Sequence, residues 1–350
     1  MGDTTTGRAF IGSFTSAGGR GIIAADVDAE TGALTATGVS DALADPSYLA
    51  LGQSAAGPVL YAVSEGDEGA VGAFALRDGG LAPLGGPVPV DGSGPTHLAV
   101  HDGHLLTANY GSGSVSVLPL AEDGTIGPVR CVVRHEGSGP DPDRQRGPHA
   151  HQVLPDPSGR WVLAVDLGID AVLVYTLDRA TGTLTPHGRT ALRPGTGPRH
   201  LAFHPAGRHA YVLNELEPTL TVCRWDAAAG VLEPVGEVPL LPEDGAAGRV
   251  YPSEVVVAPD GRRLWVALRG HDSVAVLDLD PSGERADPVT TVPCGGRWPR
   301  DLARDPAGRR LYAANERSGE VGWFTLDPET GVPRWAGSLD APAASCVIFT

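Results

Sequence analysis

Lysine is absent from this sequence of 350 residues, so all 26 basic residues are arginines. This excludes any mechanism that needs a lysine Schiff base or a lysine general base. Cationic groups in a binding site must therefore be guanidinium groups, which hold carboxylates and phosphates through paired hydrogen bonds.

Cysteine is scarce and scattered. The sequence has no CxxC spacing, which excludes a zinc knuckle or a redox motif of that kind. The four cysteines are Cys131, Cys223, Cys294 and Cys346. We expect free thiols that pack as small hydrophobic side chains.

Long apolar runs are missing as well, and none approaches the ~18 residues of a membrane helix. The segment from Met1 to Arg8 has no apolar stretch of the secretory type. The formal net charge is −16, whereas binding to nucleic acid or to an anionic membrane depends on clustered basic residues. We therefore predict a soluble, cytoplasmic protein with no nucleic-acid or membrane partner.

The motifs of several enzyme classes are absent. There is no GxSxG nucleophile elbow, no HExxH, no P-loop and no GxGxxG, so serine-hydrolase and nucleotide chemistry have no support. A Trp-Asp dipeptide occurs once, at Trp225-Asp226, and is not repeated at a fixed spacing. A WD-repeat scaffold is therefore not indicated.

What the sequence does contain is a repeat. A proline followed by a short apolar strand recurs seven times, at intervals of 43 to 54 residues. The clearest copies read PRHLAFHPAGRHAYVLNE from Pro198, PSEVVVAPDGRRLWVALRG from Pro252 and PRDLARDPAGRRLYAANE from Pro299. The other anchor prolines are Pro46, Pro95, Pro148 and, more weakly, Pro342. Each clear copy predicts a strand, a Pro-x-Gly turn and a second strand.

A second turn falls between these copies, as in DAETGAL from Asp28, DRATGTL from Asp178 and DPETGV from Asp327. Two hairpin turns in each unit of ~50 residues give four short strands, which is one propeller blade. Sustained helical periodicity is absent, and the coils of an open β-solenoid are too short for two hairpins. We therefore predict an all-β fold, a single seven-bladed β-propeller domain over residues 1–350 with four antiparallel strands per blade.

The two ends of the chain are expected to share one blade. The chain begins in mid-blade with Phe10-Ile11-Gly12-Ser13-Phe14 and ends on a lone strand, Cys346 to Phe349. If the C-terminal strand takes the innermost position, the ring closes and leaves no unpaired inner edge. A closed ring needs no partner for stability, so we expect a monomer.

Polar residues gather where the first strand of each unit begins and the second ends. In an antiparallel pair these two points lie at the same end, so both sets flank one mouth of the central channel. Near the anchor prolines stand Tyr48, His97, His149, His151, Arg199, His200, Glu254, Arg300 and Asp301. The second strands close with Glu65, Asn109, Asp166, Asn214, Glu215, Arg269, Asn315 and Glu316. A scaffold does not need so many ionisable groups on one rim.

The densest group is His151, Asp166, Arg199, Glu215 and Arg269. A lactone carbonyl attacked by water develops negative charge, which a fixed arginine stabilises, and a second arginine can hold an anionic tail. His151 or Glu215 is the candidate proton acceptor. The alternative is that strand-end polar residues cap loops and that Arg199 and Glu215 form a structural ion pair.

His149, His151 and Asp166 raise the question of a metal, but the sequence offers no obvious third histidine ligand, and we expect neither metal nor other cofactor. We interpret His97, His200 and His271 as loop or core histidines rather than catalytic groups. Contacts to the substrate are predicted for His149, Asp166, Asn214 and His271.

Three segments, PHAHQVLPDPSGRWVLAVDLGID, GPRHLAFHPAGRHAYVLNE and ALRGHDSVAVLDLD, resemble the bacterial 6-phosphogluconolactonase family of seven-bladed propellers. The resemblance runs through the whole chain, and the family is related to a fungal carboxymuconate cycloisomerase. It implies a metal-independent catalytic site that matches His151, Arg199, Glu215 and Arg269 here. The loop from Asp141 to Arg146 has a composition able to alter substrate choice. Arg144 or Arg146 is a candidate for reaching a phosphate, and a solvated loop is the alternative.

Three functions remain open at this point. The first is a hydrolase, a lactonase of carbohydrate metabolism that opens a sugar-acid lactone, with 6-phosphogluconolactone of the pentose phosphate pathway as the expected substrate. The second is a cycloisomerase that forms or opens a muconate-type lactone with the same residues. The third is a non-catalytic interaction propeller, which predicts an exposed apolar patch on a face or blade edge.

Overall fold

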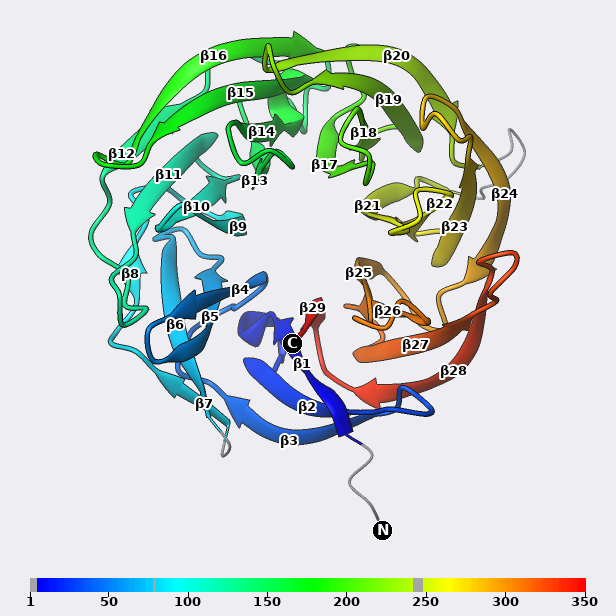
Figure 1. The fold of residues 1–350 in the computed structure, drawn as a ribbon, viewed down its shortest axis with the longest axis horizontal. Coiled ribbons are helices and arrows are strands. Elements are labelled where there is room, and N and C mark those ends of the chain that lie inside the picture. Colours follow the sequence, from blue (N-terminus) through cyan, green and yellow to red (C-terminus); the bar gives the residue numbers. More distant parts are fainter. Residues whose placement is uncertain (1–4, 78–79, 242–247) are drawn as a thin grey trace.

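The computed structural model describes residues 5–77, 80–241 and 248–350. Its strands form seven antiparallel sheets, which stand as blades around a central axis, and Figure 1 shows the closed ring face on. The structure confirms the predicted fold class. We number the blades 1 to 7 along the chain, beginning with the blade that contains both of its ends.

Four strands per blade run from the axis outward. The innermost strands of blades 1 to 7 are β29 (Ala344–Phe349), β4 (Leu49–Ser54), β9 (Pro95–His101), β13 (Ala150–Pro155), β17 (Pro198–Phe203), β21 (Tyr251–Val257) and β25 (Pro299–Arg304). The second strands are β1 (Thr5–Ser13), β5 (Gly57–Ser64), β10 (His104–Asn109), β14 (Val162–Asp166), β18 (His209–Asn214), β22 (Arg263–Arg269) and β26 (Arg310–Asn315). The third strands are β2 (Ile22–Asp28), β6 (Ala70–Arg77), β11 (Ser114–Pro119), β15 (Ala171–Asp178), β19 (Thr219–Asp226), β23 (Ser273–Leu279) and β27 (Glu320–Leu326). The outer strands are β3 (Leu34–Ser40), β7 (Gly80–Pro83) with β8 (Val88–Pro89), β12 (Cys131–Arg134), β16 (Thr183–Ala191), β20 (Val231–Pro239), β24 (Ala286–Pro293) and β28 (Pro333–Asp340).

The ring closes through blade 1, as the sequence predicts. Strand β29 pairs antiparallel with β1, with Phe10 opposite Ile348 and Ile11 opposite Val347. The sheet order β29-β1-β2-β3 puts the C-terminal strand next to the axis (Figure 1). Backbone hydrogen bonds between the two ends of the chain therefore take the place of a covalent closure.

The hydrophobic core is divided into seven layers, one between each pair of neighbouring blades. This arrangement follows from sheets that are apolar on both faces, and all six residues of β26 are buried. Hydrogen bonds link adjacent blades as well: Tyr211 donates to Gly283 O at 2.8 Å and Tyr312 donates to Gly32 O at 2.9 Å. Because the apolar surface is buried between blades, the central channel is free to carry polar groups.

The outer strands carry features that protect sheet edges. Each of β16, β20 and β24 has an irregularity in its pairing beside a proline, at Pro186, Pro234 and Pro288. A bulge and a missing backbone N–H both oppose pairing with another strand.

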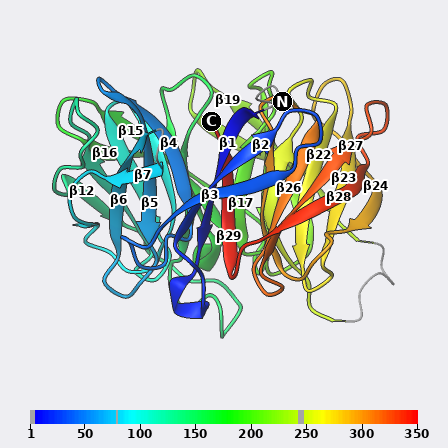
Figure 2. The same cartoon turned by 90° about the horizontal axis from the view of Figure 1, so that it is seen from below.

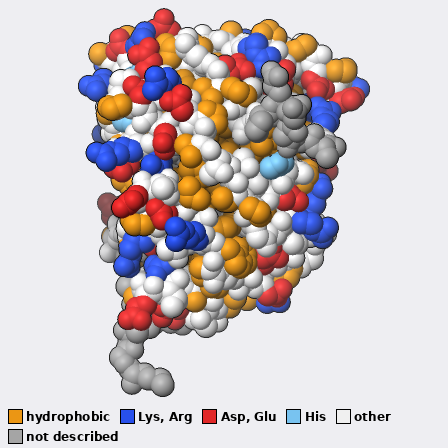
Figure 3. Space-filling view, turned by 90° about the vertical axis from the view of Figure 1, so that its right-hand side faces the viewer, with side chains coloured by type: hydrophobic (Ala, Val, Ile, Leu, Met, Phe, Trp, Pro, Cys, Tyr) orange, Lys and Arg blue, Asp and Glu red, His pale blue; other side chains and the backbone are white. Residues whose placement is uncertain are grey.

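Large apolar side chains stand apart from one another on the outside. In the described part of the chain the exposed ones are Val39, Val231, Val289 and Trp335, on four different blades. On the side seen in Figure 3, hydrophobic side chains lie among charged and other polar ones. The helices of the described residues are the short 3-10 turns η1 (Thr15–Ala17) and η2 (Leu167–Ile169), and neither is long and apolar enough to cross a bilayer.

The strand register brings the predicted polar residues to one mouth of the channel. Pro198 pairs with Asn214 and Pro299 with Asn315, so the start of each first strand lies beside the end of the second. The turn η1, which follows the end of β1, projects at this mouth and is the blue coil near the lower edge of Figure 2. The connections that enter the innermost strands border the same mouth.

Candidate active site

Glu215 lies at the centre of a charged group at the mouth. It follows β18 directly, and its side chain is 5% exposed. Its Oε2 is 2.7 Å from Arg269 Nη2 and 3.1 Å from Arg199 Nε, and its Oε1 accepts a hydrogen bond from Arg144 Nη2 at 2.6 Å. Burial favours the neutral acid, but Arg269, Arg199 and Arg144 outweigh it and lower the pKa of Glu215 to about 2. The carboxylate therefore stays ionised and holds three cations together.

Backbone carbonyls fix the two strand-borne arginines. Arg199, on β17, donates from Nη1 to Ser253 O, and Arg269, at the end of β22, donates from Nε to Tyr251 O at 3.1 Å. Burial and the neighbouring Arg269 lower the pKa of Arg199 to about 9, which leaves it protonated at neutral pH. The two guanidinium groups thus form a preorganised positive site in which little water competes.

His151, on β13, lies beside this group and is buried. Its ring packs edge-on against Tyr110 and His200, with ring centroids 5.6 and 5.1 Å away. Its Nδ1 has no hydrogen-bond partner within the protein. Burial and the nearby Arg199 lower the pKa of His151 well below the usual value, so the imidazole is neutral and able to accept a proton.

His149 borders the same mouth and is partly buried. Its ring stacks on Tyr110 with centroids 4.4 Å apart, and its Nδ1 donates to Tyr110 O at 2.8 Å. Tyr110 also accepts a hydrogen bond from Arg144 at its hydroxyl, at 3.1 Å. Tyr110 was not among the sequence-predicted residues, although it takes the same position after β10 that Glu215 takes after β18, and that shared register could have marked it.

Asp166 supports this wall from behind. It is completely buried, and its Oδ2 is 2.6 Å from His135 Nδ1. Its Oδ1 accepts from the backbone N–H of His149 at 2.8 Å and of Gly168 at 2.9 Å. Both oxygens are thus engaged inside the protein, which gives Asp166 a positioning role toward His149. Its contact with substrate stays a prediction.

Asn214 and His271 also have local partners. Asn214 Nδ2 donates to Thr219 Oγ1 at 2.9 Å and to Thr221 Oγ1 at 3.0 Å. Asn109, at the equivalent place in blade 3, binds two serine hydroxyls in the same way, which indicates a shared structural role in the turn. His271 Nδ1 lies 2.6 Å from Ser273 Oγ in its own turn. Their contacts with substrate stay predictions.

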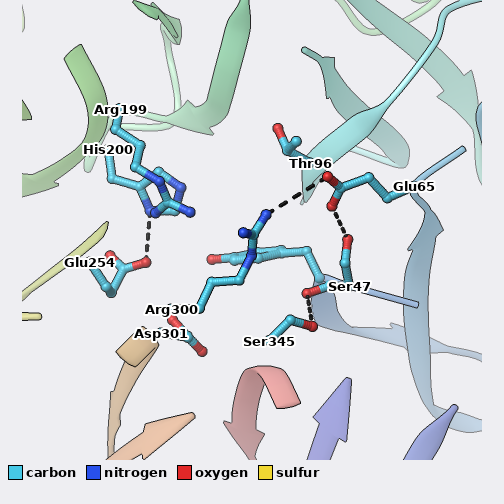
Figure 4. Close-up of a pocket in the computed structure, with 10 residues that line it drawn as sticks. Ser47, Glu65, Thr96, Arg199, His200, Glu254, Arg300, Asp301 and Ser345 are labelled. Atoms are coloured by element: carbon cyan, nitrogen blue, oxygen red, sulfur yellow. Dashed lines mark hydrogen bonds and ion pairs between the residues drawn. The ribbon is translucent and has the colours of Figure 1, made fainter. Parts of the chain in front are cut away.

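The channel carries a second polar group beside Arg199, in the cavity shown in Figure 4. His200 Nδ1 and Glu254 Oε2 share a hydrogen bond of 2.7 Å, and both side chains are buried. Burial raises the pKa of Glu254 to about 7, against the opposing effect of Arg199. Burial and the charge of Glu254 also raise the pKa of Asp301 well above its usual range. His200 is buried, as the sequence predicts for a core histidine, but its side chain also lines the channel.

A third charged group stands on blade 7. Arg300 Nη1 is 3.2 Å from Glu316 Oε2, and Arg300 Nη2 is 3.7 Å from Glu65 Oε1. Figure 4 shows Arg300 reaching across the cavity toward Glu65. Ser47 donates to Glu65 at 2.5 Å. Here one guanidinium faces two carboxylates, the reverse of the arrangement at Glu215.

No group of three or more His, Cys, Asp or Glu side chains in the described ranges is placed to hold a metal ion. The four cysteines are free thiols; Cys131 is partly exposed and the other three are buried.

Comparison with known proteins agrees with this architecture. Residues 8–349 match the family model described as Lactonase, 7-bladed beta-propeller. The chain is 36% identical to the 6-phosphogluconolactonase of Bacillus subtilis over 97% of each chain. The periplasmic gluconolactonase of Pseudomonas aeruginosa superposes with a TM-score of 0.91 at 30% identity and covers 98% of each chain. A solved protein from Lactobacillus plantarum gives a TM-score of 0.92 at 28% identity, over 98% of this chain and 99% of that one. The chain therefore belongs to the lactonase family of seven-bladed β-propellers, enzymes that hydrolyse lactones.

Proposed function

We propose that this lactonase opens a sugar-acid lactone at the mouth described above and that 6-phosphogluconolactone is its substrate. The observation that carries the proposal is Glu215, one buried carboxylate held by three guanidinium groups beside a neutral histidine. The excess positive charge suits an anionic substrate and a reaction that builds negative charge. A relative with 36% identity is named for this activity.

The proposed reaction is attack of water on the lactone carbonyl. As the water oxygen bonds to carbon, His151 accepts the proton and the carbonyl oxygen becomes an anion, which Arg199 and Arg269 stabilise. Collapse of this intermediate breaks the ring C–O bond, and His151 returns the proton to the departing oxygen. The imidazolium formed in between is offset by the adjacent anion.

Glu215 acts in this scheme as a positioning residue. Both carboxylate oxygens of Glu215 are already engaged by guanidinium groups, whereas Nδ1 of His151 has no partner within the protein, so His151 is the better-placed proton acceptor. Glu215 keeps Arg199 and Arg269 side by side, which like charges would otherwise oppose.

A test is the rate of 6-phosphogluconolactone hydrolysis above the spontaneous background, for wild type, Arg199→Ala, Glu215→Ala and His151→Gln. Arg285→Ala is the matched control, since that side chain is exposed and stands just before the outer strand β24. We expect the three site variants to lose most activity while circular dichroism shows an intact fold. If folded wild type gives no rate above background, the assignment of 6-phosphogluconolactone as substrate is wrong. Gluconolactone and then muconate-type substrates are tested next.

The cytoplasmic location and the monomeric state stay predictions. The neighbour from Pseudomonas aeruginosa is described as periplasmic, so the fold is not tied to one compartment.

A further inference from the structure

Arg144 differs from the other two arginines that contact Glu215. Its side chain is 32% exposed, against 4% for Arg199 and 7% for Arg269. It comes from the loop between β12 and β13, whereas the other two lie on strands. It contacts Oε1 of Glu215, while Arg199 and Arg269 both contact Oε2.

The backbone that carries Arg144 is firmly anchored. Asp141 Oδ1 accepts from the N–H groups of Asp143 at 2.9 Å and Arg144 at 3.0 Å. The next residue, Gln145, is completely buried and donates from Nε2 to Leu167 O and to Asp170 Oδ1, both at 2.8 Å. The loop thus holds Arg144 at a fixed place over the mouth and leaves its guanidinium accessible.

Arg146 is two residues away and behaves differently. Its side chain is 79% exposed, donates to Pro142 O within the loop and lies 3.7 Å from Asp143. Of the two loop arginines considered from the sequence, the structure therefore brings only Arg144 to the charged group at the mouth.

Arg144 can change partner without leaving Glu215 unpaired. If Arg144 turns away, Oε2 of Glu215 keeps Arg269 at 2.7 Å and Arg199 at 3.1 Å. Three guanidinium charges face one carboxylate here, so the excess positive charge of the group matches the charge of a dianion. A phosphate monoester supplies that charge and accepts paired hydrogen bonds from a guanidinium.

We propose that Arg144 is the specificity-determining residue for lactones that carry a phosphate monoester, and that the phosphate replaces Glu215 Oε1 as its partner. This rests on the proposed function. Arg144 and Arg199 contact the two oxygens of a single carboxylate, so one sugar-sized ligand reaches both. The lactone carbonyl then lies at Arg199 and Arg269, with the phosphate at Arg144.

The test compares kcat/KM for 6-phosphogluconolactone and for unphosphorylated gluconolactone in wild type, Arg144→Ala and Arg146→Ala. We expect Arg144→Ala to lower the ratio of the two values about 10- to 100-fold, mainly through a higher KM for the phosphorylated lactone. Arg146→Ala keeps the wild-type ratio. An equal loss on both lactones means that Arg144 acts through Glu215 and overturns the proposal.

Calorimetric binding of 6-phosphogluconate and of gluconate supplies a readout that needs no turnover. Wild type is expected to bind the phosphorylated acid more tightly, and Arg144→Ala is expected to remove most of that preference. Failure of the proposed function gives a different result from failure of the Arg144 proposal, because folded wild type then hydrolyses neither lactone. A preference for 6-phosphogluconate that survives in Arg144→Ala contradicts the assignment of Arg144.

Discussion

Blades 5 and 7 share an arginine and a glutamate at equivalent positions of the mouth and yet form different sites. In each, an arginine follows the anchor proline and a glutamate follows the second strand 16 residues later, as Arg199 and Glu215 and as Arg300 and Glu316. The two pairs also have nearly the same closest approach, 3.1 Å and 3.2 Å. In blade 5 two further guanidinium groups join the glutamate, whereas in blade 7 a second carboxylate, Glu65, joins the arginine.

The difference teaches that strand pairing sets where these side chains lie, while neighbouring blades set their charge. The blade 5 group has an excess of positive charge and the blade 7 group an excess of negative charge. The blade 5 pair is also more deeply buried, with side chains 4% and 5% exposed against 18% and 22%. Electrostatic effects are stronger where water is excluded, so blade 5 is the better site for a reacting anion.

The largest expected effect comes from removing the equivalent arginine of each pair. Arg199→Ala is expected to lower kcat/KM for lactone hydrolysis about 10²- to 10³-fold, as loss of an oxyanion donor does in other enzymes. Arg300→Ala is expected to lower kcat/KM less than about 10-fold. Arg300 faces two carboxylates, so its group has no excess positive charge to stabilise an anion. Steady-state kinetics on both folded variants check this, and equal losses would mean that the two groups act together on the substrate.

The next effect is the pH dependence of stability that Glu215 confers. Its pKa is lowered from 4.5 to about 2, so its contribution is present above about pH 4.5 and is lost as the pH falls toward 2. At pH 6 the unfolding free energy of wild type is expected to exceed that of Glu215→Gln by about 3 kcal/mol. At pH 3 this difference is expected to be smaller by about 2 kcal/mol. Urea denaturation at both pH values measures this, and a pH-independent difference contradicts it.

Glu254 sharpens the comparison because its shift has the opposite sign. Burial raises its pKa from 4.5 to about 7, and the groups that face it are His200, Arg199, Asp301 and Tyr48. A raised pKa means that ionisation costs stability, so wild type loses stability as the pH rises from about 4.5 through 7. The advantage of Glu254→Gln over wild type is expected to grow by about 2 kcal/mol between pH 5 and pH 8 in urea denaturation. An advantage that stays constant between pH 5 and pH 8 would show that Glu254 is ionised throughout and would contradict the raised pKa.

Much of this arrangement could be predicted from the sequence, because strands and turns are local. Anchor prolines at ~50-residue spacing, with turns that contain Asp and Gly between them, predicted seven four-stranded blades. The antiparallel rule then placed Arg199, Glu215 and Arg269 at one mouth.

The partners that these residues find on other blades and loops could not be predicted, because they depend on how blades face one another. Glu215 meets Arg269 across 54 residues and Arg144 across 71, and His200 meets Glu254 across 54. Nothing in the local pattern distinguishes such pairs from other charged residues on the rim. Asp166 is the same case, since His135, its buried partner, comes from a loop in which no motif marks it.

The smallest expected effect is that of Glu316→Gln, the blade 7 equivalent of Glu215→Gln. The pair it breaks is 3.2 Å long, but both side chains are about one-fifth exposed, and Arg300 keeps Glu65 as a partner. Partly exposed ion pairs contribute about 0 to 1 kcal/mol, so the loss of unfolding free energy is expected to be below about 1 kcal/mol at pH 7. Urea denaturation beside Glu215→Gln gives the direct comparison. A loss as large as that of Glu215→Gln would mean that the shared Arg-Glu spacing, and not the neighbouring charges, determines what each pair contributes.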